Sequence, residues 1–289
     1  MIKIYDIETL EEREILFRGG SGADVSAPVA EILRAVQERG DAALREYTLR
    51  FDGAAPDALA VTAEEVDQAA AQVEPAFLAV LEEAAEHIRA YHARQKRESF
   101  VMTEREGVVL GQRIIPLARV GIYVPGGTAA YPSTVLMNAI PARIAGVGEI
   151  IMVTPPGRDG AVNPHILAAA KIAGVTRIYK VGGAQAVAAL AYGTGTIPQV
   201  DKIVGPGNAY VAEAKRQVFG RVNIDMIAGP SEVLVLADGR SNPAWVAADL
   251  LSQAEHDRMA AAVLVTDSRP LAEAVAHELE RQLAALPRA

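Results

Sequence analysis

Apolar residues in the first hundred positions recur at helical spacing. In the first helix that this pattern predicts, Pro28 falls in the first turn, where proline is tolerated. Thr62 followed by Glu65 fits a capping box that opens a second helix. A third, starting at Pro75, has its apolar positions on one stripe. That stripe comprises Phe77, Leu81, Ala84, Ala85 and Ile88. The predicted helices cover residues 25–47, 62–73 and 75–98.

From about Arg113 onward, short runs of β-branched residues alternate with segments long enough for a helix. This alternation predicts parallel sheets built from βαβ units. The predicted strands are Val120–Val124, Ile150–Thr154, Arg177–Val181, Lys202–Val204, Glu232–Ala237 and Ala262–Thr266. The predicted helices are Pro132–Ala145, Pro164–Ala173, Ala184–Tyr192, Asn208–Phe219, Pro243–Ser252 and Pro270–Leu286.

Three glycine-bearing turns each follow a predicted strand and precede a helix, at residues 124–127, 181–185 and 204–208. Such turns gather at the carboxyl edge of a parallel sheet, where helix N-termini and bare backbone N–H groups can bind an anion. The G-x-G-x-x-G fingerprint is missing, because no G-x-G triplet has the third glycine. Tight turns and a nucleotide pocket both fit this pattern.

Gln253 and His256 lie three positions apart at the end of a predicted helix, so both side chains project from one face. Imidazole suits Zn²⁺, and an amide oxygen is a weaker ligand. A capping or solvated histidine explains the same spacing, and two ligands do not complete a catalytic zinc site. The remaining histidines (His87, His92, His165 and His277) fit surface or capping positions.

Composition narrows the possible functions. The 289 residues carry a net charge of −8, which disfavours non-specific nucleic-acid binding, and no apolar run approaches the roughly 18 residues of a membrane span. Acidic residues stand where a signal peptide needs a basic start, so we expect a cytoplasmic protein. The absence of cysteine excludes disulfides, thiolate metal sites and a cysteine nucleophile.

Several long segments closely resemble histidinol dehydrogenase and occur in that family's order. They are VGIYVPGG (120–127), STVLMNAIPARIAGV (133–147), KVGGAQAVAALAYGT (180–194), DKIVGPGNAYVAEAKRQV (201–218), IAGPSEVLVLAD (227–238) and DLLSQAEHD (249–257). Further upstream, ALREYTLRFDG (43–53) is also similar. The resemblance implies a four-electron oxidation of L-histidinol through histidinaldehyde to L-histidine, with two NAD⁺ reduced and one zinc ion bound.

The resemblance also implies an architecture and a partner. We expect an aldehyde-dehydrogenase-like α/β fold with two incomplete Rossmann-like parallel-sheet domains, an N-terminal helical region and an intertwined homodimer. A Rossmann-like NAD-binding lobe would occupy residues 119–230. It would be inserted in a discontinuous domain made of residues 1–118 and 231–289, in which the N-terminal helices pack with the C-terminal segment.

Carried over by motif, the resemblance assigns six site residues. Tyr123, Gln185 and Asn208 would contact NAD. Ser231 would contact L-histidinol, and Gln253 and His256 would bind both zinc and substrate. Zinc would fix the reacting carbon of the substrate against the nicotinamide.

The family's Glu–His pair for proton transfer and its remaining zinc ligands, an Asp and a His, lie downstream of the SQAEH segment and are not found before Ala289. We therefore assign no catalytic residue and expect the 289-residue chain to be inactive alone and to hold zinc weakly. A non-catalytic module that binds nucleotide or histidinol is the alternative function.

Overall fold

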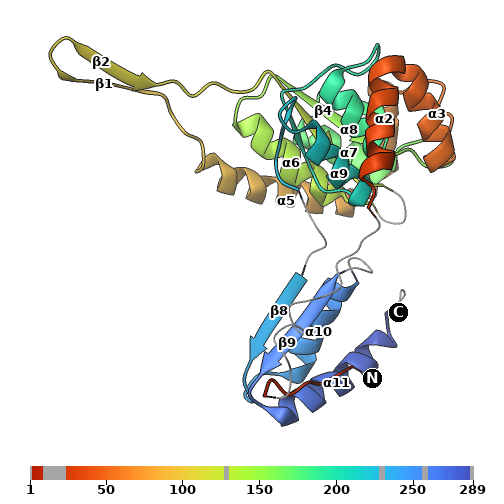
Figure 1. Cartoon of the computed structure of the whole chain (residues 1–289), viewed down its shortest axis with the longest axis vertical. Coiled ribbons are helices and arrows are strands. Elements are labelled where there is room, and N and C mark those ends of the chain that lie inside the picture. Colours follow the sequence, from red (N-terminus) through yellow and green to blue (C-terminus); the bar gives the residue numbers. More distant parts are fainter. Residues whose placement is uncertain (1, 9–23, 127–129, 228–231, 256–259, 287–289) are drawn as a thin grey trace. The chain divides into compact units, whose positions relative to one another are not determined.

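The computed structural model describes residues 2–8, 24–126, 130–227, 232–255 and 260–286 (Figure 1). By its internal contacts the chain divides into two compact units. One comprises residues 24–227, and the other groups residues 228–289 with residues 1–23. None of the helices in the described ranges combines the length and apolar composition needed to cross a bilayer.

A five-stranded, fully parallel sheet organises the unit 24–227, in the order β5-β4-β3-β6-β7. The strands are β3 (Arg119–Tyr123), β4 (Glu149–Thr154), β5 (Arg177–Lys180), β6 (Lys202–Val204) and β7 (Asn223–Ile224). The first four of these were predicted within one residue at each end. The two-residue β7 was not predicted. The predicted α/β class with parallel strands is confirmed.

Helices cover both faces of this sheet, since successive strand residues point to opposite sides. Ile151 and Val153 of β4 face one core, and Ile150 and Met152 face the other. The first core is closed by α2 (Ser26–Arg39), α3 (Asp41–Asp52), α8 (Gly183–Tyr192) and α9 (Ala209–Val218). The second is closed by α4 (Ala63–Gln72), α5 (Pro75–Ala93), α6 (Pro132–Ile144) and α7 (Pro164–Ala173).

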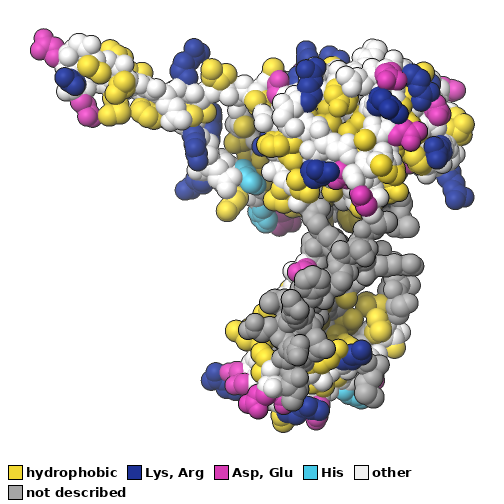
Figure 2. Space-filling view, in the orientation of Figure 1, with side chains coloured by type: hydrophobic (Ala, Val, Ile, Leu, Met, Phe, Trp, Pro, Cys, Tyr) yellow, Lys and Arg dark blue, Asp and Glu magenta, His cyan; other side chains and the backbone are white. Residues whose placement is uncertain are grey.

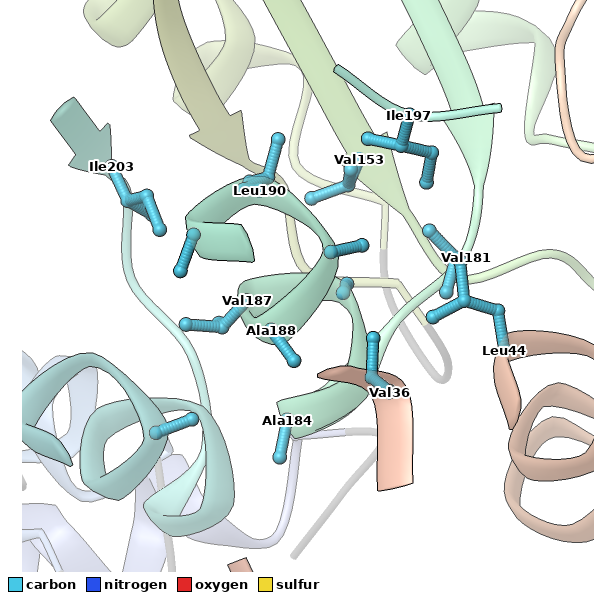
Figure 3. Close-up of a cluster of buried hydrophobic side chains, with 14 of the residues drawn as sticks. Val36, Leu44, Val153, Val181, Ala184, Val187, Ala188, Leu190, Ile197 and Ile203 are labelled. Atoms are coloured by element: carbon cyan, nitrogen blue, oxygen red, sulfur yellow. The ribbon is translucent and has the colours of Figure 1, made fainter. Parts of the chain in front are cut away.

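Helix α8 runs through the centre of the first core (Figure 3). Every residue from Ala184 to Ala191 is buried, so this helix has no solvent face. Six of these eight residues are small, namely five alanines and one valine. Their short side chains let α8 lie close to its neighbours. On β3, Gly121 provides room for Leu190, whose Cδ1 would lie 2.8 Å from a Cβ at that position.

The N-terminal helices differ from the predicted division of the chain. Residues 25–47 do not form one helix, because Gly40 adopts φ +53° and separates α2 from α3. Both helices bury their apolar stripes in the first core, through residues such as Val36 and Leu44 (Figure 3). Helices α2 to α5 therefore belong to the same compact unit as the sheet, rather than to a domain with residues 231–289.

The capping box at Thr62 and Glu65 is present and opens α4. Helix α5 also begins where predicted, with Leu81 and Ala85 buried on its stripe. It ends at Ala93, however, and the charged segment that follows leads into an antiparallel hairpin. This hairpin is β1 (Phe100–Arg105) and β2 (Val108–Gln112), and it extends away from the helices of its unit (Figure 1).

The second unit contains two parallel strands and two helices. These are β8 (Glu232–Ala237), α10 (Pro243–Ala254), β9 (Ala261–Thr266) and α11 (Arg269–Leu283). Their small core includes Val246 and Leu250 of α10 with Leu271, Val275 and Leu279 of α11. The apolar stripe predicted on the last helix is therefore the face that packs on α10, except that Leu283 is 43% exposed.

Candidate functional site

The glycine turns meet at the carboxyl edge of the five-stranded sheet, as predicted. A Cβ on Gly126, after β3, would lie 2.7 Å from Pro155, and a Cβ on Gly182, after β5, would lie 2.6 Å from the same proline. A Cβ on Gly205, after β6, would lie 2.2 Å from the carbonyl oxygen of Tyr123. The three turns are thus packed against one another, and side chains at these positions would prevent it.

Tyr123, one of the three proposed NAD contacts, ends β3 and is buried. Its hydroxyl accepts a hydrogen bond from the backbone N–H of Gly183 at 3.0 Å, which links the β3 edge to the first turn of α8. Burial raises the pKa of Tyr123 to about 12; the Gly183 bond lowers it, and the Asp52 carboxylate raises it further. The hydroxyl therefore stays protonated and can donate to a ligand.

Gln185 lies in the first turn of α8 and is only 1% exposed. Neither its amide oxygen nor its amide nitrogen has a hydrogen-bond partner among the described residues. An unpaired buried amide costs free energy, of the order of 1–3 kcal/mol, so such groups are rare unless a bound molecule supplies the partner. The N-terminus of α8 also has no side-chain cap. Both observations favour a polar ligand at this turn.

Asn208, the third proposed NAD contact, is the N-cap of α9. Its side-chain oxygen accepts a hydrogen bond from the N–H of Val211 at 3.1 Å, as a capping asparagine does. This bond uses the oxygen and leaves the amide N–H groups to donate to a ligand. Tyr123, Gln185 and Asn208 therefore come from the three turns that meet at one edge.

Two charged groups near these turns were not identified from the sequence. Asp52, at the end of α3, has a buried Oδ2 with no hydrogen-bond partner in the described part of the chain, and burial raises its pKa to about 6. Lys215 of α9 is 2% exposed and pairs with Asp225, just after β7. Asp52 comes four residues after the buried Thr48 of α3, and Lys215 comes four residues after the buried Val211 of α9. A charged residue at this spacing, on the buried face of a helix, could have been noticed in the sequence.

A cavity of about 680 Å³ lies elsewhere in the same unit, between the end of α5, α6 and the strands β3 and β6. Its lining is mostly apolar and includes Ile115, Met137 and Val204, together with Lys202 and Asp225. None of the three proposed NAD contacts lines it. This cavity reaches the glycine turns only through Val204 and Asp225, at the start of the third turn.

The proposed zinc and substrate residues belong to the second unit. Gln253 is the penultimate residue of α10, which ends at Ala254 as the sequence pattern indicated within two residues. Ser231 and His256 lie outside the described residues. Within the described ranges, no group of three or more His, Asp or Glu side chains is arranged to hold a metal ion.

The histidines expected to be structural have ordinary surroundings. The ring of His165 packs edge-on against Phe77, with 4.9 Å between ring centroids, and the backbone N–H of His165 donates to the side-chain oxygen of Asn163 at 2.9 Å. His92 lies beside the amide of Gln95 at 2.6 Å.

Comparison with known proteins places these features in one family. The sequence model of histidinol dehydrogenase matches residues 18–289. Histidinol dehydrogenase of Geobacillus kaustophilus is 62% identical over 260 residues, covering 90% of this chain and 61% of that protein. The Listeria monocytogenes (strain F2365) enzyme is 54% identical over 281 residues, covering 97% of this chain and 66% of that protein.

A solved structure gives the same result at the level of the fold. The crystal structure of histidinol dehydrogenase from Elizabethkingia anophelis superposes with a TM-score of 0.87 at 41% identity, covering 93% of this chain and 62% of that one. The chain thus spans between 61% and 66% of the length of these relatives. Because the match runs through both compact units and includes all three glycine turns, the chain belongs to the histidinol dehydrogenase family.

Proposed function

We propose that the protein in its intact form oxidises L-histidinol through histidinaldehyde to L-histidine, with NAD⁺ as the hydride acceptor and zinc as a bound metal, and that the 289 residues alone bind NAD⁺ without turnover. Family membership supports the reaction. The observation that carries the NAD⁺ part is the buried, unpartnered amide of Gln185 at the edge where the glycine turns meet. Among the described residues this amide has no partner, which favours a bound polar molecule at this edge.

These residues fit a dinucleotide. The Tyr123 hydroxyl and the amides of Gln185 and Asn208 offer both donors and acceptors, which ribose hydroxyls, phosphates and carboxamide require. The uncapped N-terminus of α8 adds backbone N–H groups that favour an anion. When bound, NAD⁺ would supply the acceptor for the hydride of the alcohol and, after water has added to the aldehyde, for the hydride of the resulting hydrate. The task of the three side chains is to hold and orient it.

Zinc is part of the proposal through the family alone. Of its two proposed ligands, only Gln253 lies among the described residues, and one amide oxygen is too weak a ligand to hold the ion. We therefore assign zinc no step in the reaction. The proposal predicts that a chelator abolishes histidinol-dependent NADH formation by the intact protein and that added zinc restores it. Turnover that persists in metal-free protein would contradict it.

The decisive variant for NAD⁺ is Gln185→Leu. Because the amide is buried without a partner, leucine should leave the free energy of unfolding unchanged or raise it. The same change should weaken NAD⁺ binding by about tenfold or more, since ligand groups lose their partner. Isothermal titration with NAD⁺ and urea unfolding measure the two effects.

Gln217→Leu is the matched control. Gln217 is a part-buried glutamine of α9 whose amide nitrogen donates to the carbonyl of Ser26 at 2.9 Å and to Glu213 at 2.7 Å. Its replacement should lower stability and leave NAD⁺ affinity unchanged, the opposite pattern. Equal NAD⁺ affinity for the wild type and Gln185→Leu would refute the proposed site. Binding of NAD⁺ without histidinol turnover by the intact protein would support the alternative, a non-catalytic binding module.

We also propose that the protein forms a homodimer in which the β1–β2 hairpin is an arm that the partner covers. Val101, Val109 and Leu110 are each at least 60% exposed, and apolar side chains run along the hairpin in Figure 2. An isolated two-stranded hairpin is marginally stable in water, so exposed apolar residues on it indicate a partner. Val101→Lys with Leu110→Glu should shift the protein toward monomer in sedimentation equilibrium. A dimer of unchanged affinity would exclude the hairpin as its interface.

A further inference from the structure

A buried ion pair fastens the glycine turn after β6. Lys215 of α9 donates from Nζ to the carbonyl oxygen of Gly205 at 2.9 Å and contacts Asp225 Oδ1. Asp225 Oδ2 accepts the N–H of Gly205 at 2.8 Å. The pair therefore satisfies both backbone groups of Gly205, one from each side chain.

Gly205 depends on these bonds because of its conformation. It adopts φ +114° and lies against the backbone of Tyr123. With this φ the chain turns away from the direction of β6, so the N–H and carbonyl of Gly205 need partners outside the sheet. Asn208 follows three residues later as the N-cap of α9, the helix that carries Lys215. The ion pair thus closes a loop that starts at the end of β6 and ends at a proposed NAD⁺ contact.

Asp225 makes one more bond, and it points to a second task. Its Oδ1 accepts the N–H of Met226 at 2.7 Å. Met226 and Ile227 are the last residues of the unit 24–227 before the chain passes into the unit that contains residues 228–289. The same carboxylate therefore bonds both the glycine turn and the last residues of this unit.

Stability alone is a weak reason for such a pair. Removing two charges from water costs several kcal/mol per ion, and apolar replacements of buried pairs are often neutral or stabilising. Apolar side chains, however, could not bond the N–H and carbonyl oxygen of Gly205 and the N–H of Met226. The ion pair therefore serves to hold these two backbone segments in place.

We propose that Lys215 and Asp225 are positioning residues, which hold the Gly205–Asn208 turn and the backbone at Met226 in fixed positions so that the proposed NAD⁺ contact Asn208 is kept in place. The NAD⁺ contact of Asn208 rests on the proposed function above. The positions of the two backbone segments do not depend on the proposed function, so the structural claim and the claim about NAD⁺ can be tested separately.

The test compares Lys215→Met with Lys180→Met. Lys180 ends β5, is also buried and pairs with Glu65, but its ion pair bonds no glycine turn. Each variant loses the ion pair of one buried lysine in the same compact unit. Only Lys215→Met should speed amide hydrogen exchange at Gly205 and Met226, by about tenfold or more, because only it loosens their bonds. It should also raise the Kd for NAD⁺ by about tenfold, whereas Lys180→Met leaves this Kd unchanged.

Lys215→Arg, which keeps a cation, should recover part of both effects. If Lys215→Met does not fold, Asp225→Asn tests the same bonds, since an amide oxygen replaces only one of the two acceptors. Unchanged exchange at Gly205 and Met226 in a folded variant overturns the proposal. If the wild type does not bind NAD⁺, the proposed function fails, and the exchange rates still decide whether the pair holds the two segments in place.

Discussion

Asp52→Asn should make the protein more stable at neutral pH, and the gain should disappear in acid. Burial raises the pKa of Asp52 from 3.8 to about 6 in the folded protein. Its Oδ2 has no hydrogen-bond partner among the described residues, and its place at the C-terminal end of α3 puts it where the helix dipole disfavours a negative charge. The folded protein therefore binds this proton more tightly than the unfolded chain does.

The sign of the effect follows from that difference. The stabilisation by the bound proton is fully present below pH 3.8, falls as the pH rises through the interval to about 6, and is absent above it. A difference of this size corresponds to roughly 3 kcal/mol at full burial. Because the carboxyl group is only partly buried, solvent screening reduces the expected contribution to about 1–2 kcal/mol.

Urea unfolding of the wild type and Asp52→Asn at several pH values between 4 and 7 measures this. The difference in free energy of unfolding should be near zero at pH 4 and about 1–2 kcal/mol in favour of the variant at pH 7. Taking the difference cancels the titration of all other groups. A gain that is the same at every pH would show that the ionisation of Asp52 is not its source, and a loss at pH 7 would refute the reasoning.

Asp41 is the matched control at the other end of the same helix. Burial raises its pKa, but hydrogen bonds from Thr194 and Thr196 outweigh this and hold it below 3.8. Its charged form is the stabilised one, so its contribution is present at neutral pH and is lost as the pH falls through the folded pKa. Asp41→Asn should therefore destabilise the protein at pH 7, and less so in acid. The two variants should show opposite pH slopes.

Two further predictions concern close packing. Gly205→Ala should abolish detectable NAD⁺ binding in isothermal titration, because the new Cβ would lie 2.2 Å from the carbonyl oxygen of Tyr123. Gly53→Ala is the control, since Gly53 also has a positive φ but no atom within 4 Å of its Cβ position. It should lower only the free energy of unfolding, by about 1 kcal/mol. Leu190→Ala should lower the free energy of unfolding by about 2–5 kcal/mol. Gly121→Ala should cost less in that background than in the wild type, which a double-mutant cycle in urea can measure.

The sheet could be predicted from the sequence because its strands are buried on both faces and so appear as short β-branched runs. β4, for example, is apolar at four successive positions, Ile150 to Val153. The two-residue β7 has no such run, and β1 and β2 pack against no core that would impose a pattern. The break at Gly40 was missed because the apolar spacing continues past it into α3.

The candidate site could be predicted only in part. The meeting of the glycine turns followed from parallel topology, whereas Tyr123, Gln185 and Asn208 came from family resemblance, since nothing local marks a tyrosine or an amide as a ligand. The Lys215–Asp225 pair depends on two residues brought together by α9 and β7. Lys215 could have been noticed as a charge on a buried stripe, but its partner follows a strand that has no signal.

The full burial of α8 has a consequence for how this protein tolerates change over evolutionary time. A helix on the surface accepts substitutions on its outer side, so that variation recurs with the helical repeat. Ala184 to Ala191 have no outer side, and each added methyl group meets a neighbour from the sheet, α2 or α9. In a saturation mutagenesis library, substitutions should be poorly tolerated at every one of these eight successive positions. A profile without the helical repeat would, taken alone, be read as that of a buried strand.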